Sequence, residues 1–452
     1  MKTEYKYLRE NIRNSLWNGI AWSIGFNFVN PFIGVLAAQL GATNSDYALL
    51  SSIPALLTIL LTLPASLVLA RFRRQKRIVG VTILVCRFFY FLLVFVPWLG
   101  FSQVSALILL VGLYSATNMI ISVAWQAMMG EIIPGEFRNQ VFSGRNLWTG
   151  FTGMVVAFIA GWGIDRFPYP FGYQLAFSIG FLAALVEVWY FLKLRIPSEE
   201  QQEDQQTNSI TANGQTEPSR AGTHRSQPDR GNSPLRSLWK GFISTYKLNV
   251  NAPYYLFCIA AIVFTFTWQA AWPVYLKVKV DLLHATNTMI SINTIAGAIG
   301  ALIGYRLWAR IADRKGTAWT VFYSSFSLAL TPFCWIFAPN MIWVNLYDFI
   351  GGVATAGFQQ AVFNRLLEVT PSEGRQKALA AYTTLSQVSA VFAPIAGMQL
   401  FSTVSYDLCM FLIGGARILG SVCFLVILSR FIAKRIAANH RNRTAQNPHA
   451  NV

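Results

Sequence analysis

Polar side chains recur at helical spacing inside long apolar segments of this sequence. Asp348, Gly352, Thr355 and Gln359 follow one another at intervals of four, three and four residues, which places them on one face of a helix. Carboxylate, hydroxyl and amide groups that face lipid lose their hydrogen bonds, so they are expected to face protein or a wet cavity. The chemistry that such a stripe predicts is solute binding within a membrane.

Three further apolar segments carry polar and aromatic side chains on one helical face. These residues either line a solute pathway or hydrogen-bond between packed helices, as Ser, Thr, Asn and Gln often do in membranes. Four stripes of one kind favour the pathway, although Trp and Tyr near helix ends also form interfacial belts. The three stripes are Ser23, Asn27, Asn30 and Gly34; Tyr114, Asn118, Ser122 and Trp125; and Thr265, Trp268, Gln269 and Trp272.

The segments that carry these stripes are long enough to cross a membrane. Hydrophobic residues make up 54% of the chain and charged residues 12%, whereas a soluble domain carries about 25% charge. About 20 consecutive apolar residues are needed to cross the hydrocarbon core as a helix. The sequence therefore predicts an all-α integral membrane protein with twelve transmembrane helices, near 15–40, 46–70, 78–99, 103–129, 142–164, 171–194, 252–276, 287–311, 317–337, 341–366, 378–402 and 407–433.

The positions of lysine and arginine indicate how these helices are oriented. With both termini in the cytoplasm, nearly all of the 36 basic residues lie in cytoplasmic segments or at cytoplasmic helix ends. Only Arg166, Lys277 and Lys279 lie outside, and Arg87 and Arg417 lie within helices. We therefore expect residence in a bacterial cytoplasmic membrane, and the net charge of +17 does not predict nucleic-acid binding.

The chain divides at a polar stretch between the sixth and seventh helices. Its Gln, Ser, Asn and Pro content buries too little apolar surface to fold, which predicts a disordered tether. The N-terminus lacks a small-residue cleavage site before its first apolar run, so it predicts a cytoplasmic lead-in. The expected division is a lead-in at 1–14, a six-helix bundle at 15–195, a linker at 196–250, a second bundle at 251–433 and a cytoplasmic tail at 434–452.

Catalytic and cofactor motifs do not appear in the pattern of reactive residues. The five cysteines stand singly in apolar segments, which predicts neither a metal site nor a disulfide framework. All four histidines lie outside the predicted helices, and no HExxH, GxSxG or GxxxxGK[ST] pattern occurs. We therefore expect no cofactor, no enzymatic activity and no ATP drive.

The two predicted bundles repeat one another in sequence. With an offset of 242–243, Pro31 falls on Pro273, and the triplet Ala-Thr-Asn at 42–44 falls on the same triplet at 285–287. With an offset of about 237, the pattern ExxPxExR at 131–138 falls on 368–375, and AFIAG at 157–161 falls on APIAG at 393–397. Four ordered matches predict two parallel repeats related by an axis along the membrane normal.

This architecture resembles the major facilitator superfamily. Six plus six helices, cytoplasmic termini and a long central loop are shared, and the stretch ARIADRKG at 309–316 is similar to the family's G-x-x-x-D-R-x-G motif. The equivalent stretch at 66–74 keeps the basic residues but lacks the aspartate. The resemblance implies that the first, fourth, seventh and tenth helices line a central cavity, which makes Asn27, Asn30, Tyr114, Asn118, Ser122, Trp125, Trp268, Gln269, Trp272, Asp348, Thr355 and Gln359 candidate pathway residues.

The same resemblance implies a cytoplasmic gate. Asp313 and Arg314 would be gate residues that bond to the other half, with Arg138 and Arg375 as their candidate partners. The alternative is that these charges form a polar helix end that follows the basic-residue rule. In drug exporters of the family the fourth helix carries an arginine and the fifth a G-P-x-x-G-G pattern, and neither occurs here.

Charges within the helices have separate interpretations. Asp348, the single acid on a stripe, is a candidate substrate or coupling-ion site or else a wetted vestibule group. Arg87 and Glu187 lie at compatible depths on helices that the fold makes neighbours, which predicts a structural ion pair. Arg145 is either a gate contact or a snorkelling residue, and Arg417 has no partner that the sequence identifies.

These observations together predict a secondary transporter that works by alternating access. We expect a monomer in the bilayer that moves a small organic solute, neutral polar or amphipathic and cationic, with a proton or cation as the candidate coupling ion. The stripes contain no Arg or Lys, which disfavours carboxylate or phosphate substrates. An efflux pump of the same fold, and a channel or lipid scramblase, are the alternative functions.

Overall fold

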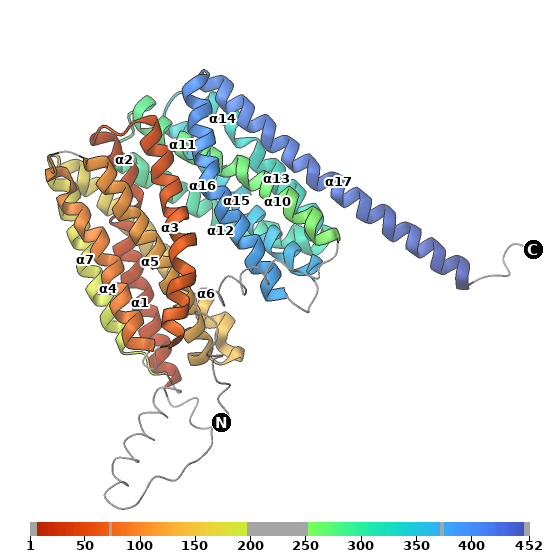
Figure 1. Cartoon of the computed structure of the whole chain (residues 1–452), viewed down its shortest axis with the longest axis horizontal. Helices are drawn as coiled ribbons and strands as arrows, with labels where there is room; N and C mark the ends of the chain where they lie inside the picture. The colour runs from red at the N-terminus through yellow and green to blue at the C-terminus, as the bar shows by residue number, and fades with distance from the viewer. Residues whose placement is uncertain (1–6, 72–74, 101, 197–251, 371–374, 447–452) are drawn as a thin grey trace, which may run out of the picture.

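The computed structural model describes residues 7–71, 75–100, 102–196, 252–370 and 375–446, and these residues form helices and short connections. We call each membrane-spanning unit a rod, whether it is one helix or a helix broken into shorter pieces. The first six rods make up one half of the molecule (Figure 1). In chain order this half comprises α1 Leu8–Asn27, η1 Asn30–Phe32, α2 Ile33–Gln39, α3 Asn44–Arg71, α4 Gln75–Leu92, η2 Leu93–Trp98, α5 Gln103–Ile132, α6 Gly135–Arg166 and α7 Phe171–Leu192.

The second half repeats this order of six rods. Ten segments of the described chain are long and apolar enough to span a membrane, and α13–α14 and α15 complete the twelve predicted spans. The prediction of twelve transmembrane helices in two six-helix repeats is therefore confirmed. The second half comprises α10 Ala252–Ala270, α11 Trp272–Lys277, η3 Val278–Leu282, α12 Asn287–Lys315, α13 Thr317–Ala329, α14 Thr331–Ile336, α15 Met341–Val369, α16 Arg375–Thr403 and α17 Tyr406–Gln446.

Prolines interrupt the rods at related places in the two halves. The first rod breaks after Phe28, where Pro31 lies in η1, and the seventh breaks at Ala271, next to Pro273 in α11. The ninth rod breaks at Leu330, before Pro332. A proline lacks an N–H and its ring clashes with the carbonyl four residues earlier, so it opens the helix there. The matched pair Pro31 and Pro273 therefore has the same structural consequence in both repeats.

The first and last helices of the chain are longer than the sequence predicts. Helix α1 begins at Leu8 instead of 15, because no glycine or proline interrupts residues 8–15. Helix α17 continues past the predicted end at 433 to Gln446, the last residue that the structure describes. Residues 197–250 of the predicted linker at 196–250 lie outside the described part of the chain, as do residues 1–6 and 447–452.

Close approaches between glycines and backbone fix the packing of α12 on α15. A Cβ added at Gly300 would collide with the Phe349 carbonyl, and one at Gly352 would collide with the Gly297 carbonyl. At Gly304 the added Cβ would lie 2.7 Å from the Val353 carbonyl oxygen. Small residues allow such backbone contact between membrane helices, where dispersion replaces the hydrophobic effect.

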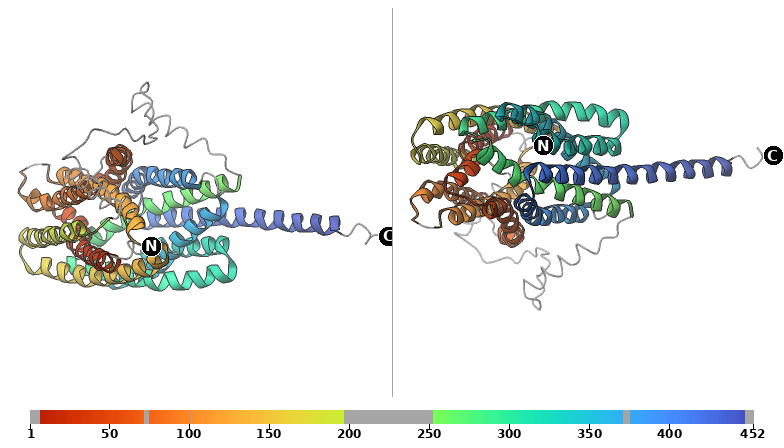
Figure 2. Two further views of the ribbon diagram at one scale, coloured as in Figure 1. Left: turned by 90° about the horizontal axis from the view of Figure 1, so that it is seen from below. Right: turned by 90° about the horizontal axis from the view of Figure 1, so that it is seen from above.

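The two halves meet at one end of the molecule, which we call the closed end. This end holds the connections 40–43, 167–170 and 283–286. Here Val35, Tyr47 and Ala48 of the first half share a buried cluster with Val274, Val278 and Ile290 of the second. The ribbons of the halves diverge towards the opposite end, which holds the start of α1 and which we call the open end (Figure 1). Views from below and from above show the halves side by side (Figure 2).

Candidate functional site

A cavity of about 360 Å³ lies within the second half, between the broken rods and helix α15. Five of its lining residues come from the predicted stripes: Trp268, Trp272, Asp348, Gly352 and Thr355. Residues from five rods enclose it, so its shape depends on how the whole half packs. The other lining residues are Tyr275, Lys279, Asn293, Thr294, Gly297, Leu328, Thr331, Trp335, Gly351 and Arg417.

Aromatic rings form much of the cavity wall. The rings of Trp268 and Trp272 meet edge to face with centroids 5.4 Å apart, and Tyr275 lies 4.3 Å from Trp335. The helix break at Ala271 separates α10 from α11 between the two tryptophans. Such a wall offers apolar faces that stack on rings or on the apolar face of a solute.

An ion pair bridges the cavity from η3 to α15. The Lys279 Nζ lies 3.0 Å from Asp348 Oδ2 and donates at 2.6 Å to Asn293 Oδ1. The side chains of Lys279 and Asp348 are 17% and 27% exposed, so the pair keeps access to the cavity. The amide nitrogen of Asn293 is buried and has no partner among the described residues. Asp348 is thereby neutralised, while the Asn293 amide remains a donor without an acceptor.

Arg417 is fully buried behind this wall and is held by neutral acceptors. Its guanidinium donates to the Thr267 and Trp268 carbonyls at 3.4 and 3.0 Å, which belong to the last turn of α10, where helical carbonyls have no internal partner. It also donates at 3.3 Å to the Leu328 carbonyl, whose usual helical donor would be residue 332, a proline. The sequence does not identify partners for Arg417, and the structure shows that they are chiefly backbone carbonyls at two helix breaks.

The first half contains a second buried polar network. Arg87 and Glu187, the predicted pair, contact each other through two hydrogen bonds of 2.9 and 3.0 Å, and each side chain is 5% exposed. The same guanidinium donates to the Tyr114 hydroxyl at 2.8 Å and to Asn118 Oδ1 at 3.2 Å. Tyr114 and Asn118, two of the pathway candidates, therefore accept hydrogen bonds from an arginine that lies outside the polar stripes.

This network reaches the first rod through stacked rings. Tyr90 stacks on Tyr114 with centroids 3.5 Å apart and donates its hydroxyl to Asn30 Oδ1 at 3.1 Å. Asn30 is exposed, and it lies at the break between α1 and α2. A polar chain thus runs from Glu187 on α7 to an exposed amide on the first rod.

The remaining pathway candidates are distributed more widely. Asn27 donates to the Ser23 carbonyl of its own helix at 2.8 Å, and Gln269 is buried against α16, where it accepts from Ser389 at 2.7 Å. Ser122 is partly buried, whereas Gln359 is exposed. The indole nitrogen of Trp125 is buried and has no partner among the described side chains.

The predicted gate residues are not in contact in this conformation. Asp313, Arg314 and Arg375 are exposed, and Arg138 donates to the carbonyls of Gly130 and Ile133 at 2.8 and 3.2 Å. Among the described residues, no hydrogen bond or ion pair joins these four side chains to one another. Arg145 stacks over the Trp125 ring at 4.4 Å and donates to the Ser15 carbonyl, so it ties α6 to α5 and α1.

The polar contacts between the halves lie at the closed end instead, on residues that sequence reasoning missed. Asp165, at the end of α6, accepts from the backbone N–H groups of Asn287 and Thr288 at 3.1 and 2.8 Å and from their side chains at 2.9 and 2.6 Å. Tyr173 donates to Asn287 Oδ1 at 3.0 Å. We call Asp165, Tyr173, Asn287 and Thr288 the carboxylate cap. The sequence feature that could have indicated this contact is the repeated triplet at 285–287, which contains Asn287.

Both halves of the chain match one known protein family. A family model described as the Major Facilitator Superfamily matches residues 17–267 and 257–448, one match over each half. The search of curated protein sequences finds no significant match.

Solved structures share the fold at low sequence identity. The nucleoside transporter NupG matches with a TM-score of 0.64 at 12% identity, covering 94% of this chain and 99% of that chain. The inward-open xylose transporter XylE from E. coli has a TM-score of 0.62 at 13% identity, covering 93% and 96%. A bacterial homologue of the iron transporter ferroportin, in an inward-facing state, has a TM-score of 0.64 at 14% identity, covering 93% and 98%.

Proposed function

Because the chain belongs to the Major Facilitator Superfamily, we propose that it is a secondary transporter that moves a small, neutral, polar organic solute by alternating access. The cavity bounded by Trp268, Trp272 and the Lys279–Asp348 pair carries this proposal. Its volume of about 360 Å³ is in the range of small-molecule sites. An apolar wall with a few convergent polar groups is the composition expected of such a site.

The charge balance of the cavity favours a neutral solute. Lys279 neutralises Asp348, and the Arg417 guanidinium is occupied by carbonyl and hydroxyl groups. What remains for a ligand is the Thr355 hydroxyl and the tryptophan faces, with the Asn293 side chain in the cavity wall. A hydroxylated ring, as in a sugar or a nucleoside, matches donors and acceptors beside an aromatic wall. The structural likeness to a nucleoside transporter and a xylose transporter supports this class.

We further propose that the open end faces the cytoplasm, as the basic residues predict. The conformation is then inward-facing, with the halves held together on the external side. In the alternating-access cycle the closed-end contacts break and the predicted gate residues Asp313 and Arg314 approach Arg138 or Arg375. The Lys279–Asp348 pair is the proposed proton-coupling site, since a proton on Asp348 would release the lysine.

A ligand screen on the purified protein tests this proposal. Uncharged sugars and nucleosides are added in turn while the melting temperature is recorded, and the hits are used in counterflow with proteoliposomes. We expect accumulation of labelled solute against unlabelled solute, because a carrier exchanges the two and a channel does not. Uptake that equilibrates without such accumulation would establish the channel or scramblase alternative.

Cavity variants then locate the binding site. Trp272→Ala should weaken binding about threefold to tenfold, since aromatic contacts contribute about 0.5–1.5 kcal/mol beyond buried area, and Asp348→Ala should reduce both binding and coupling. Trp162→Ala is the matched control, because Trp162 is half exposed on α6 and lies outside the cavity. If both cavity variants bind and exchange the hits as the control does, the site lies elsewhere.

A further inference from the structure

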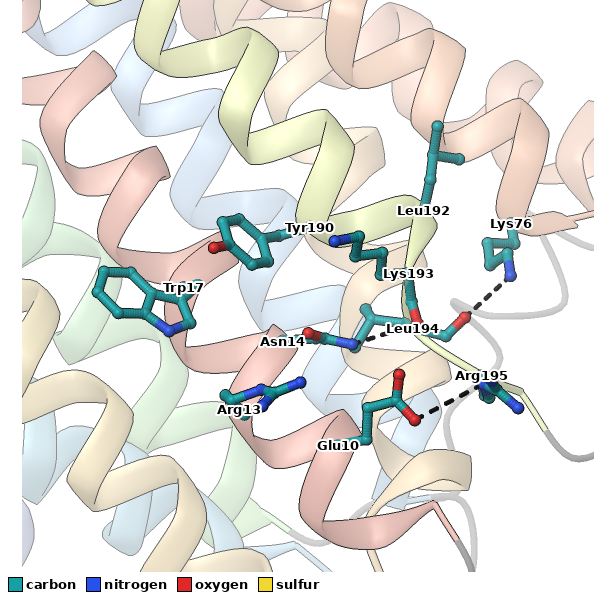
Figure 3. A pocket seen from close by; sticks show the side chains of 10 residues that line it. All are labelled: Glu10, Arg13, Asn14, Trp17, Lys76, Tyr190, Leu192, Lys193, Leu194 and Arg195. Atoms are coloured by element: carbon teal, nitrogen blue, oxygen red, sulfur yellow. Dashed lines mark hydrogen bonds and ion pairs between the residues drawn. The ribbon is translucent and has the colours of Figure 1, made fainter.

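A second cavity, of about 600 Å³, lies at the open end between the ends of α1, α4 and α7. Figure 3 shows its lining, in which basic side chains from three helices surround one space. Arg13, Lys76, Lys193 and Arg195 line it, and Glu10 is the single acid among the lining residues. None of the candidate pathway residues lines this cavity, so the proposed transport site does not explain its surplus of positive charge.

The cavity is built by contacts that fix the chain where α7 ends. Lys76 Nζ donates to the Leu194 carbonyl at 2.9 Å, and Asn14 Nδ2 donates to the Lys193 carbonyl at 3.3 Å. Glu10 approaches Arg195 at 3.8 Å (Figure 3). The carbonyls of Lys193 and Leu194, which directly follow α7 and would repel an anion, are therefore bonded to donors. The carboxylate of Glu10 is paired with Arg195, so the remaining charge of the cavity is positive.

Two basic side chains remain available to a ligand. Arg13 and Lys193 are exposed, and Arg13 has no hydrogen bond or ion pair among the described residues. Lys193 Nζ lies over the Trp189 ring at 3.4 Å. The rings of Trp17 and Tyr190 stack at 6.1 Å beside them and line the same cavity. Basic groups next to Trp and Tyr are typical of the headgroup region of a membrane.

An exposed apolar stripe on α7 leads directly to this cavity. Leu182, Val186 and Trp189 are 60%, 45% and 54% exposed, and their spacing of four and three residues places them on one helical face. Lys193 continues the same face after four more residues. Exposed apolar side chains on a transmembrane helix contact lipid tails. The face thus offers a surface for acyl chains that ends at a cluster of positive charge.

We propose that this cavity binds the phosphate of an anionic phospholipid headgroup, with an acyl chain of the lipid along Leu182, Val186 and Trp189. Arg13 and Lys193 contact the phosphate, and Lys76 and Arg195 supply further positive potential. The position of the cavity at the end of the membrane-spanning helices favours a lipid over a soluble phosphate. The bound lipid would link α1, α4 and α7 at the open end.

Native mass spectrometry of the purified full-length protein tests this site. Dioleoyl phosphatidylglycerol is titrated against the protein in detergent, with dioleoyl phosphatidylcholine as the neutral reference lipid. We expect tighter binding of phosphatidylglycerol, and a loss of about tenfold in the variant with Arg13→Gln and Lys193→Gln together, because interfacial basic residues attract anionic lipid. The charge-conserving variant Arg13→Lys with Lys193→Arg should retain the preference, which separates charge from misfolding.

The matched control removes two exposed lysines from the open end of the other half, Lys315→Gln with Lys377→Gln. It should bind phosphatidylglycerol as the unmodified protein does. Equal binding by the Arg13 and Lys193 double variant and by this control would overturn the proposal. Competition by millimolar inorganic phosphate as effective as that of the lipid would overturn the lipid as ligand and establish a soluble phosphate instead.

Discussion

In the part of the chain that the structure describes, two arginines are buried in the membrane-spanning core, and they are held in different ways. Arg87 contacts a carboxylate, Glu187, whereas Arg417 contacts only neutral acceptors among the described residues, chiefly backbone carbonyls. A buried charge is tolerated where its hydrogen bonds are satisfied. The first arginine therefore depends on one partner side chain, and the second depends on the path of the backbone at two helix breaks.

Removal of Glu187 should destabilise the first half strongly. The variant Glu187→Gln leaves the Arg87 charge without its counterion, and breaking a buried pair costs about 3–5 kcal/mol. The double variant Arg87→Met with Glu187→Met should be far more stable than the summed losses of the single variants Arg87→Met and Glu187→Met predict. The unmodified protein, the two single Met variants and the double variant form the cycle. Thermal unfolding of the four proteins gives this comparison, and strictly additive losses would show that the pair does not act as a unit.

Arg417→Lys tests the second arrangement. Lysine keeps the charge but has no planar fork, so it cannot reach the α10 carbonyls and the Leu328 carbonyl together. We expect a lower melting temperature and weaker solute binding, because these carbonyls lie behind the Trp268 and Trp272 wall. The exposed residue Arg310 provides the control, Arg310→Lys. Equal melting temperatures for the two variants would contradict the role assigned to Arg417.

Helical spacing in the sequence predicted some of the residues that line the cavity, whereas others could not be predicted from spacing. Helical spacing brought Trp268, Trp272, Asp348 and Thr355 to one cavity, because these residues lie on faces of two rods that pack together. Lys279 and Asn293 could not be found in this way. Lys279 lies on η3, and its approach to Asp348 depends on the path of the chain after the break at Ala271. Asn293 lies on α12, where it accepts from Lys279. Spacing within one helix does not record either contact.

Helix packing in the second half depends on glycines that bring α12 and α15 into backbone contact. Gly300→Ala adds a Cβ that collides with the Phe349 carbonyl, and such overpacking costs about 1–3 kcal/mol. Gly163→Ala on α6 is the control, because its added Cβ would meet open space. A melting temperature that falls for the first variant and not for the second would agree with this packing, and equal values would contradict it.

The elements themselves were accessible from sequence because membrane helices are defined by hydrophobic length. Each predicted span corresponds to a rod, and the repeat placed Pro31 and Pro273 at equivalent breaks. The helix ends were less accessible. Helix α1 begins in polar sequence and helix α17 continues into polar sequence, where hydropathy no longer marks the helix.

At the scale of the whole molecule, the carboxylate cap should bias the equilibrium between conformations. Asp165→Asn removes the negative charge that faces the N-terminus of α12, and hydrogen bonds to a charged group contribute about 1.5–3 kcal/mol. The population with the closed end open should rise about tenfold or more. Distances between spin labels on the closed ends of α7 and α12, measured by pulsed electron paramagnetic resonance, report the two populations.

Asp46→Asn is the control for this measurement. Asp46 also lies at a helix start at the closed end, but its carboxylate accepts from Thr43 of the same half at 2.8 and 2.7 Å. Its replacement should leave the distance distribution unchanged. A shift of equal size in both variants would mean that loss of a helix cap, and not loss of the contact between halves, causes the change.

The carboxylate cap joins α6 to α12, whereas on the other side of the closed end α3 and α2 meet the seventh rod through Tyr47, Gly34 and Leu276, largely by apolar contact. Hydrogen bonds to one carboxylate are lost together once their geometry fails, but apolar side chains can slide and still remain in contact. The cap therefore acts as a latch and the apolar seam as a hinge. We expect the closed end to open first along α6 and α12, so that solute would enter or leave on that side.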